Sequence, residues 1–121
     1  MRKNTSYTYS VLCNNWKENN SNKIIMLGKI VKVIIDRPLG SYHPTYKNIY
    51  YSSNYGYIPE IMADDGEEQD AYILGIDVPL TEFTGKVVAV IHRKNDNENK
   101  WVIVHENLII SKEEILEAVH F

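Results

Sequence analysis

Short apolar runs rich in β-branched residues are the feature of this sequence that most limits how it can fold. The runs cover residues 23–36, 71–76, 85–92 and 101–104, and the tyrosine-rich residues 50–61 are typical of a strand, a turn and a short strand. They predict strands, because β-branched and aromatic side chains favour a pleated backbone and buried strands are typically about four to eight residues long. The first run, I-I-M-L-G-K-I-V-K-V-I-I-D, is long enough for one or two strands. The prolines and glycine of the next segment, R-P-L-G-S-Y-H-P-T-Y-K-N, exclude a long helix there.

A short helix is expected only near the end of the chain. Ser111 begins the segment S-K-E-E-I-L-E-A-V-H-F, and Glu114 follows three residues later, which is the signature of a capping box. Five to seven short strands with one terminal helix, and no alternation of strand and helix, indicate a mainly β fold. The residue pattern leaves two arrangements open, an antiparallel β barrel and a sandwich.

The length of 121 residues allows one domain. Residues 1–23 are polar and asparagine-rich and show no regular hydrophobic period, so we expect a loosely ordered N-terminal lead. A short strand near residues 7–12, or anchoring of the lead by Trp16, is the alternative. The single domain is expected to cover residues 24–121.

Charge and apolar content exclude several classes of protein. The net charge of −3, without a cluster of lysines and arginines, argues against nucleic-acid binding. No apolar run approaches the roughly 20 residues that a membrane-spanning helix needs. Cys13 is the single cysteine, and the first residues do not resemble a secretory signal. We therefore expect a cytoplasmic protein with no membrane association and no intrachain disulfide.

An acidic segment follows the aromatic sequence Y-G-Y-I-P after five residues. This segment, D-G-E-E-Q-D over residues 65–70, holds four carboxylates in six positions. Such carboxylates repel one another, so the segment predicts either a solvent-exposed turn or a site for a hard divalent cation. Asp36, at the end of the first run, and Asp96 and Glu98, in a polar turn, add carboxylates, although the last two are also typical of a hairpin tip. Oxygen ligands of this kind favour Mg²⁺, with Mn²⁺ as a second choice, over Zn²⁺.

The order and spacing of these motifs resemble family I inorganic pyrophosphatases. Here Y-S-S-N-Y-G-Y-I-P over residues 51–59 precedes D-G-E-E-Q-D, and F-T-G-K-V and K-W-V-I-V follow at residues 83–87 and 100–104. In that family, Y-x-x-N-Y-G-[FY]-I-P precedes D-G-D-P-x-D by the same gap. The resemblance spans residues 30–104 and implies a small antiparallel OB-like five-stranded barrel with a short C-terminal helix.

The resemblance also implies a metal site. Asp65 and Asp70 match aspartates that coordinate Mg²⁺, and Glu67 stands where an aspartate accepts a proton from the attacking water. Glu98 and Asp96 match further metal-binding aspartates. The activity implied is hydrolysis of pyrophosphate to two phosphates by a water molecule that the metal activates.

Other matching positions would surround the metal and the substrate. Asp36 matches a glutamate in the outer shell of the metal site, and Tyr51 and Tyr55 match tyrosines that hydrogen-bond around it. The side chains available to bind phosphate are Lys100, Arg93, Lys47 and His43.

Two departures from the family pattern affect the substrate side. P-L-G at residues 38–40 replaces P-K-G, and the hairpin that carries a phosphate-binding lysine and arginine in the family is shortened, which leaves His43, Lys47 or Arg37 as substitutes. In the acidic segment, Glu67 lengthens the proposed base by one methylene and Glu68 replaces a proline, which makes the loop less rigid.

The sequence therefore predicts a Mg²⁺-dependent phosphoanhydride hydrolase, most simply an inorganic diphosphatase. The alternative is a related module that binds metal or nucleotide and has lost catalysis, as the missing cations suggest. A single-stranded nucleic-acid module using the tyrosine cluster for stacking is a third option, against which the net charge argues. The expected partner is pyrophosphate, and pairing of edge strands would allow a homo-oligomer.

Overall fold

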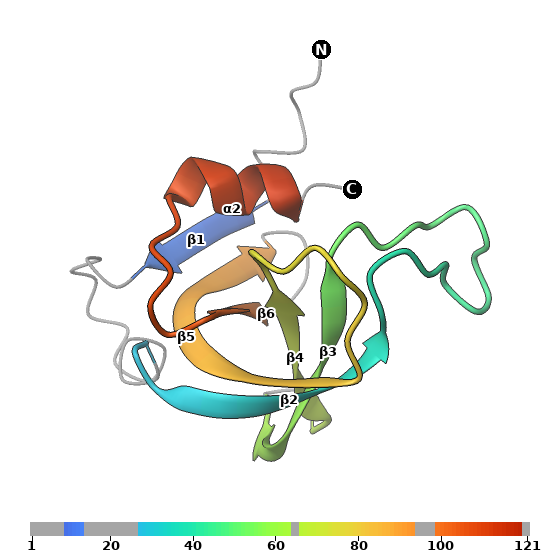
Figure 1. Cartoon of the computed structure of the whole chain (residues 1–121). Helices are drawn as coiled ribbons and strands as arrows, with labels where there is room; N and C mark the ends of the chain where they lie inside the picture. Colours follow the sequence, from blue (N-terminus) through green and yellow to red (C-terminus); the bar gives the residue numbers. More distant parts are fainter. Residues whose placement is uncertain (1–8, 14–26, 64–65, 94–98, 120–121) are drawn as a thin grey trace.

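A computed structural model describes residues 9–13, 27–63, 66–93 and 99–119 of this chain. The elements are β1 (Tyr9–Cys13), β2 (Ile30–Arg37), β3 (Asn54–Met62), β4 (Glu68–Ile73), β5 (Glu82–Arg93), β6 (Asn99–Val104) and α2 (Lys112–Ala118). The strands wind into a small barrel, and α2 lies beside β1 across one side of it (Figure 1). The helix in the described part of the chain is neither long nor apolar enough to cross a membrane.

Strands β2 to β6 close the barrel. β5 pairs with β2, β2 with β3, β3 with β4, β4 with β6, and β6 pairs again with β5. The five-stranded barrel expected from the sequence is therefore confirmed. One ladder differs from an all-antiparallel arrangement, because β4 and β6 run parallel. These two strands are separated in the chain by β5, so no tight hairpin forces them to run in opposite directions.

β5 is the long, curved strand that pairs with β1, β2 and β6 (Figure 1). Its first half pairs with β2, from Ile34 opposite Glu82 to Ile30 opposite Lys86. Its second half pairs with β6 and, on the other edge, with β1. β1 lies inside the segment predicted to be a polar lead and overlaps the alternative strand near residues 7–12. The domain division at residue 23 stays a prediction.

A bulge in β5 separates two hydrophobic cores. The register with β6 shifts between Val87 and Ala89, so Val88 is the extra residue. Val87 and Val90 point into the barrel, whereas Val88 and Ala89 both belong to the core on the helix side. A bulge bends the strand and increases its twist. The bend allows one strand to serve both sides of the barrel.

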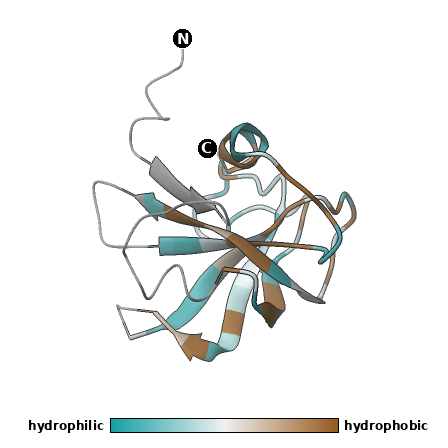
Figure 2. Cartoon of the chain, turned by 90° about the vertical axis from the view of Figure 1, so that its left-hand side faces the viewer, coloured by the Kyte–Doolittle hydropathy of each residue, from teal (hydrophilic) through white to brown (hydrophobic). Residues whose placement is uncertain are grey.

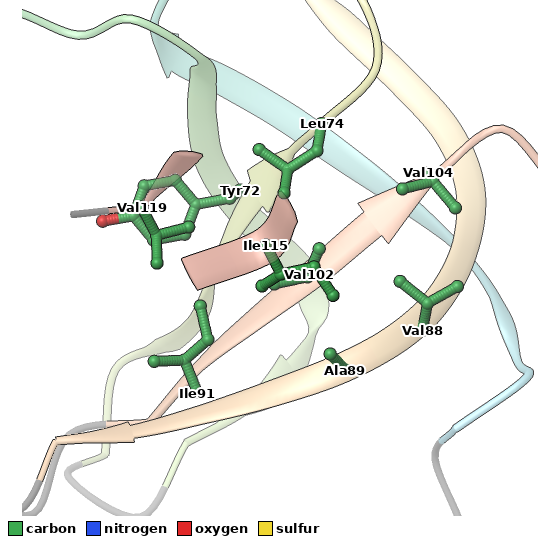
Figure 3. Packing of buried hydrophobic residues seen from close by; sticks show 9 residues of the cluster. All are labelled: Tyr72, Leu74, Val88, Ala89, Ile91, Val102, Val104, Ile115 and Val119. Atoms are coloured by element: carbon green, nitrogen blue, oxygen red, sulfur yellow. The ribbon is translucent and has the colours of Figure 1, made fainter. Parts of the chain in front are cut away.

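The remaining strands divide their side chains between the two cores by simple alternation. Ala71 and Ile73 point into the barrel, whereas Tyr72 and Leu74 point outward toward α2. Figure 2 shows that hydrophobic and hydrophilic stretches also follow one another along single strands. Figure 3 shows the outer core, where Ile115 and Val119 of the helical segment meet side chains from the strands.

The predicted capping box of the helix is confirmed. The backbone N–H of Glu114 donates to Ser111 Oγ at 3.0 Å, and the Ser111 N–H donates back to Glu114 Oε1 at 2.9 Å. Two hydrogen bonds with Ser111 lower the pKa of Glu114. The larger effect comes from the Ser111 backbone and the smaller one from the Ser111 side chain. Ile115, 1% exposed, anchors the helix, and burying a side chain of this size contributes about 2 kcal/mol.

Candidate active site

Tyr55, Asp70 and Lys100 come from three strands that lie side by side, β3, β4 and β6. In the β3–β4 ladder Tyr55 lies opposite Tyr72, and Tyr57 lies opposite Asp70. Asp70 and Tyr72 are two residues apart on β4, so they share the outer face of the barrel. The register of the ladders therefore brings these side chains to one place, next to the core that α2 covers.

Lys100 joins the other two residues. Its Nζ donates to Tyr55 Oη at 2.9 Å and to Asp70 Oδ2 at 3.1 Å. The ammonium also lies 5.3 Å from the centroid of the Tyr55 ring. The Lys100 side chain is 12% exposed and that of Asp70 is 36% exposed, so the lysine is the more enclosed partner. A lysine enclosed to this degree needs a charged or polar partner, and the paired carboxylate keeps an accessible surface for a ligand.

Aromatic rings hold Tyr55 in position. Its ring stacks on Tyr51, with centroids 5.7 Å apart, and packs against Tyr72 with centroids 4.9 Å apart. Tyr51 and Tyr72 are both buried. Sequence reasoning missed Tyr72, although its position two residues after Asp70 in a strand places it on the same face.

The described part of the acidic segment, residues 66–70, runs from a bend into β4. The Ala63 N–H donates to the Glu67 carbonyl at 2.7 Å, and Gly66 occupies a left-handed conformation with φ of 87°. Glu67 and Glu68 are exposed. Asp65 lies outside the described residues.

Gln69 is a second residue that sequence reasoning missed. It is 4% exposed, and its Nε2 donates to the Asn99 carbonyl at 2.8 Å and to the Asp70 carbonyl at 3.0 Å. The side chain thus links the start of β4 to the start of β6, next to Asp70 and Lys100. A polar residue at an inward position of an apolar strand was the available signal.

The segment between β2 and β3 is a narrow hairpin. Gly40 N–H donates to the Tyr51 carbonyl, Tyr51 N–H donates to the Ser41 carbonyl, and Tyr42 and Tyr50 form a bridge. His43 Nδ1 accepts the backbone N–H groups of Thr45 at 3.0 Å and Tyr46 at 3.1 Å. That nitrogen therefore organises the hairpin tip, where Lys47 is exposed in a turn.

Asn54 fastens the base of this hairpin and was also missed. It is fully buried, and its Oδ1 accepts the N–H groups of Leu39 at 2.9 Å and Leu80 at 3.0 Å. Its Nδ2 donates to the Val78 carbonyl at 2.9 Å. The neighbouring Gly56 lies so close to β2 that a Cβ would clash with the Ile34 carbonyl. The N-Y-G part of the aromatic motif is therefore needed for the close contact between segments.

The carboxylates predicted to hold metal are only partly described. Asp70 lies on β4, and Asp36 lies on β2 with its side chain 48% exposed. Asp96 and Glu98 lie outside the described residues, as Asp65 does, and only the backbone of Arg93 is described. Within the described ranges, no three His, Cys, Asp or Glu side chains are grouped to hold a metal ion. The predicted set consists of hard oxygen donors, which fit a divalent cation such as Mg²⁺.

His92 contacts Asn99, the residue opposite it on β6. Its Nδ1 lies 2.6 Å from Asn99 Oδ1, and the side chain is half-buried. The contact links β5 to β6 at the end of their ladder.

Comparison with known proteins relates this geometry to a family. A model of the inorganic pyrophosphatase family matches residues 16–116. A search of curated proteins finds no match. An inorganic pyrophosphatase from Coxiella burnetii has a similar fold, with a TM-score of 0.57 and 18% sequence identity over 77% of this chain and 74% of that chain. A structure described as inorganic phosphatase from Anaplasma phagocytophilum aligns with a TM-score of 0.44 and 17% identity, over 86% of this chain and 68% of that one. Since the family match covers most of the sequence, the chain belongs to the inorganic pyrophosphatase family.

Proposed function

We propose that this protein hydrolyses pyrophosphate to two phosphates in a reaction that depends on Mg²⁺. The observation that carries the proposal is the contact of Lys100 with both Tyr55 and Asp70 on the outer face of the barrel. The resemblance assigns Tyr55 and Asp70 to the site, and all three residues lie within residues 16–116, which the family model matches.

The chain's own side chains have separable roles in this proposal. Asp70 presents a carboxylate that Lys100 holds in place at 3.1 Å. The ammonium adds positive charge where a phosphate group would bind, which stabilises charge that develops during the reaction. Tyr55 is held by its ring contacts, so its hydroxyl is positioned before substrate arrives. Glu67, exposed in the turn before β4, would take the proton from the attacking water.

Mg²⁺ would be held by Asp65, Asp70, Asp96 and Glu98, with Asp36 in the outer shell. When bound, a divalent ion lowers the pKa of water and neutralises charge on phosphate oxygens. The rest of the rate depends on how well the protein orients the substrate, since phosphoryl transfer needs little covalent chemistry from side chains.

The direct test is release of phosphate from pyrophosphate by the purified protein. We expect turnover with Mg²⁺ or Mn²⁺ and loss of turnover when EDTA removes the metal, with recovery after excess Mg²⁺ is added back. A panel of nucleotides and polyphosphates measured in parallel identifies the preferred phosphoanhydride. No phosphate release from any of these compounds would refute the proposal.

A second candidate is a binding module that has lost catalysis. It is favoured by the hairpin, where P-L-G has replaced the family's P-K-G and the His43 Nδ1 atom is occupied by backbone N–H groups. Calorimetric binding of pyrophosphate without hydrolysis would support this candidate.

The location of the protein in the cytoplasm and its assembly into homo-oligomers stay predictions from the sequence.

A further inference from the structure

A bulge in β2 decides which side chains face the candidate site. Ile35 lies opposite Gly56, but the next pair joins Arg37 to Tyr55, so Asp36 is an extra residue in the ladder. Without the extra residue, position 36 would lie opposite Tyr55, and Arg37 would lie opposite Asn54, which is buried. Bulges re-aim side chains in this way and are common beside active sites. The bulge therefore places a cation on the face of β3 that carries Tyr55.

The guanidinium of Arg37 is only partly used by the protein. Its Nη1 donates to the backbone carbonyl of Asp36 at 3.2 Å and lies 3.8 Å from Asp36 Oδ2, which is too far for a hydrogen bond. Its Nε is buried and has no hydrogen-bond partner among the described residues. Buried N–H groups without a partner are rare and costly, so such an atom requires an explanation. The edge formed by Nε and Nη2 is one that can bind an oxyanion with two parallel hydrogen bonds.

Arg37 lies within reach of the candidate site. β3, which carries Tyr55, lies between β2 and β4. Neighbouring strands are about 4.8 Å apart, so the backbone of β2 at Arg37 is about 10 Å from the backbone of β4. The side chain is 28% exposed, which leaves accessible area although Nε itself is covered. Ligand binding over Tyr55 would require the covered Nε edge to turn outward.

The other candidate cations are placed less suitably in the described structure. His43 uses Nδ1 to hold its own hairpin, and Lys47 is exposed at the tip of that hairpin. Lys100 belongs to the proposed site already, through its contacts with Asp70 and Tyr55, and so does not replace the cations of the hairpin. Arg37 combines the correct face, a nearby site and an unsatisfied donor.

We propose that Arg37 binds a phosphate group of the substrate or product and replaces cations that the shortened hairpin lacks. The inference rests on the proposed phosphoanhydride site. It assigns Arg37 to substrate binding rather than to packing, and it makes the β2 bulge part of the binding site. Because arginine binds phosphate through a planar fork, lysine would be an incomplete substitute.

Binding of imidodiphosphate, a pyrophosphate analogue that resists hydrolysis, tests the inference directly. We would titrate it with Mg²⁺ into wild type, Arg37→Gln, Arg37→Lys and the control Lys32→Gln by calorimetry. Lys32 lies on the same strand, and its contact with Glu82 at 3.4 Å is solvent-exposed. Arg37→Gln should weaken binding roughly 10- to 100-fold and raise KM for pyrophosphate, Arg37→Lys should weaken it less, and Lys32→Gln should match wild type.

Wild-type affinity in Arg37→Gln would overturn the inference, and so would wild-type protein that binds no imidodiphosphate. Circular dichroism checks that the variants fold. If Arg37→Gln does not fold, Arg37→Lys decides the question, and unchanged affinity in that variant would overturn the inference. If wild type binds imidodiphosphate but releases no phosphate from pyrophosphate, the proposed hydrolysis is refuted. Weaker binding of imidodiphosphate by Arg37→Gln would still support the role of Arg37. Full activity in Arg37→Gln would support the proposed hydrolysis and refute the role of Arg37.

Discussion

The hairpin of residues 38–51 meets the cluster of Tyr55, Asp70 and Lys100 where Tyr51 stacks on Tyr55, but the two regions are built differently. In the cluster, each residue belongs to a barrel strand with a ladder on both edges. The hairpin is held by backbone hydrogen bonds within the segment and by Asn54 at its base. Its side chains are less enclosed, since Tyr42, Tyr46 and Tyr50 are each about half exposed. The ladders fix the positions of side chains on three strands at once, whereas the hairpin can change in length without disturbing them.

This difference bears on where the chain departs from the motif that the resemblance implies. The shortened segment and the missing cation fall in the hairpin, whereas on the strands Tyr55 and Asp70 match the motif and Glu68, the first residue of β4, departs from it. Variation is tolerated better where few ladders depend on it. The experiments below alter the two regions separately.

The largest effect is expected from Asp70→Asn. It removes the charge of the strand-borne carboxylate that Lys100 contacts, and turnover of pyrophosphate should fall roughly 1,000-fold or more. Phosphate release measures the loss, and circular dichroism should show an unchanged fold. Turnover within a few-fold of wild type would remove Asp70 from the proposed site.

Asn54→Ala should detach the hairpin while leaving the cluster in place. It removes three hydrogen bonds at a buried site, two of them to backbone N–H groups, so unfolding should become easier by about 3 kcal/mol. Denaturant unfolding measures this change. Asn48→Ala, an exposed change in the same hairpin, is the control and should alter stability by less than about 0.5 kcal/mol. Equal effects of the two changes would show that Asn54 does not fasten the hairpin.

A double-mutant cycle on Lys100→Met and Tyr55→Phe should show how tightly the cluster is coupled. The hydrogen bond at 2.9 Å predicts that the two changes together cost less than the sum of the single changes, by about 1 kcal/mol. Unfolding free energies and kcat/KM are measured for all four proteins. Strictly additive changes would mean that the two side chains act independently.

The smallest effect concerns the helix, which covers the outer face beside the cluster. Because the folded pKa of Glu114 lies below its ordinary value of 4.5, the charged side chain contributes stability above that value. This contribution should disappear as pH falls through the folded pKa. The thermal midpoint of wild type should therefore exceed that of Glu114→Gln at pH 7, with the gap closing in acid. Activity at pH 7 should not change, and a gap that is constant with pH would contradict the assignment.

Much of the barrel could be predicted because its strands carry regular signals. The runs at residues 71–76 and 101–104 alternate between the two cores, and Ser111 with Glu114 marks the helix start. The parallel pairing of β4 with β6 could not be predicted, because it depends on contacts between segments about 30 residues apart. The bulges at Asp36 and Val88 could not be predicted either, because an extra residue in a ladder does not change the composition of the strand.

The candidate site was predictable through motif order rather than through local pattern. Spacing linked Tyr55 to Asp70, but the contact of Lys100 with both appears only once β3, β4 and β6 are neighbours. Asn54 and Gln69 were missed because the sequence alone does not show which backbone groups a polar side chain in an apolar strand will hydrogen-bond. Arg37 was one of three substitutes for the lost cations, and the bulge distinguishes it from the others.

The arrangement of β5 also constrains how the chain can reach its native state. This strand pairs with segments on both sides of it in the chain, and β6 must pair with β4 and β5 to close the barrel. A chain emerging from the ribosome thus exposes open edges on β4 and β5 until residues 99–104 have left the exit tunnel. Because the pairings of β1 and β2 with β5, and of β4 with β6, are long in sequence separation, folding should be slow for a protein of this size. Conditions that delay synthesis between β5 and β6 would prolong the aggregation-prone stage.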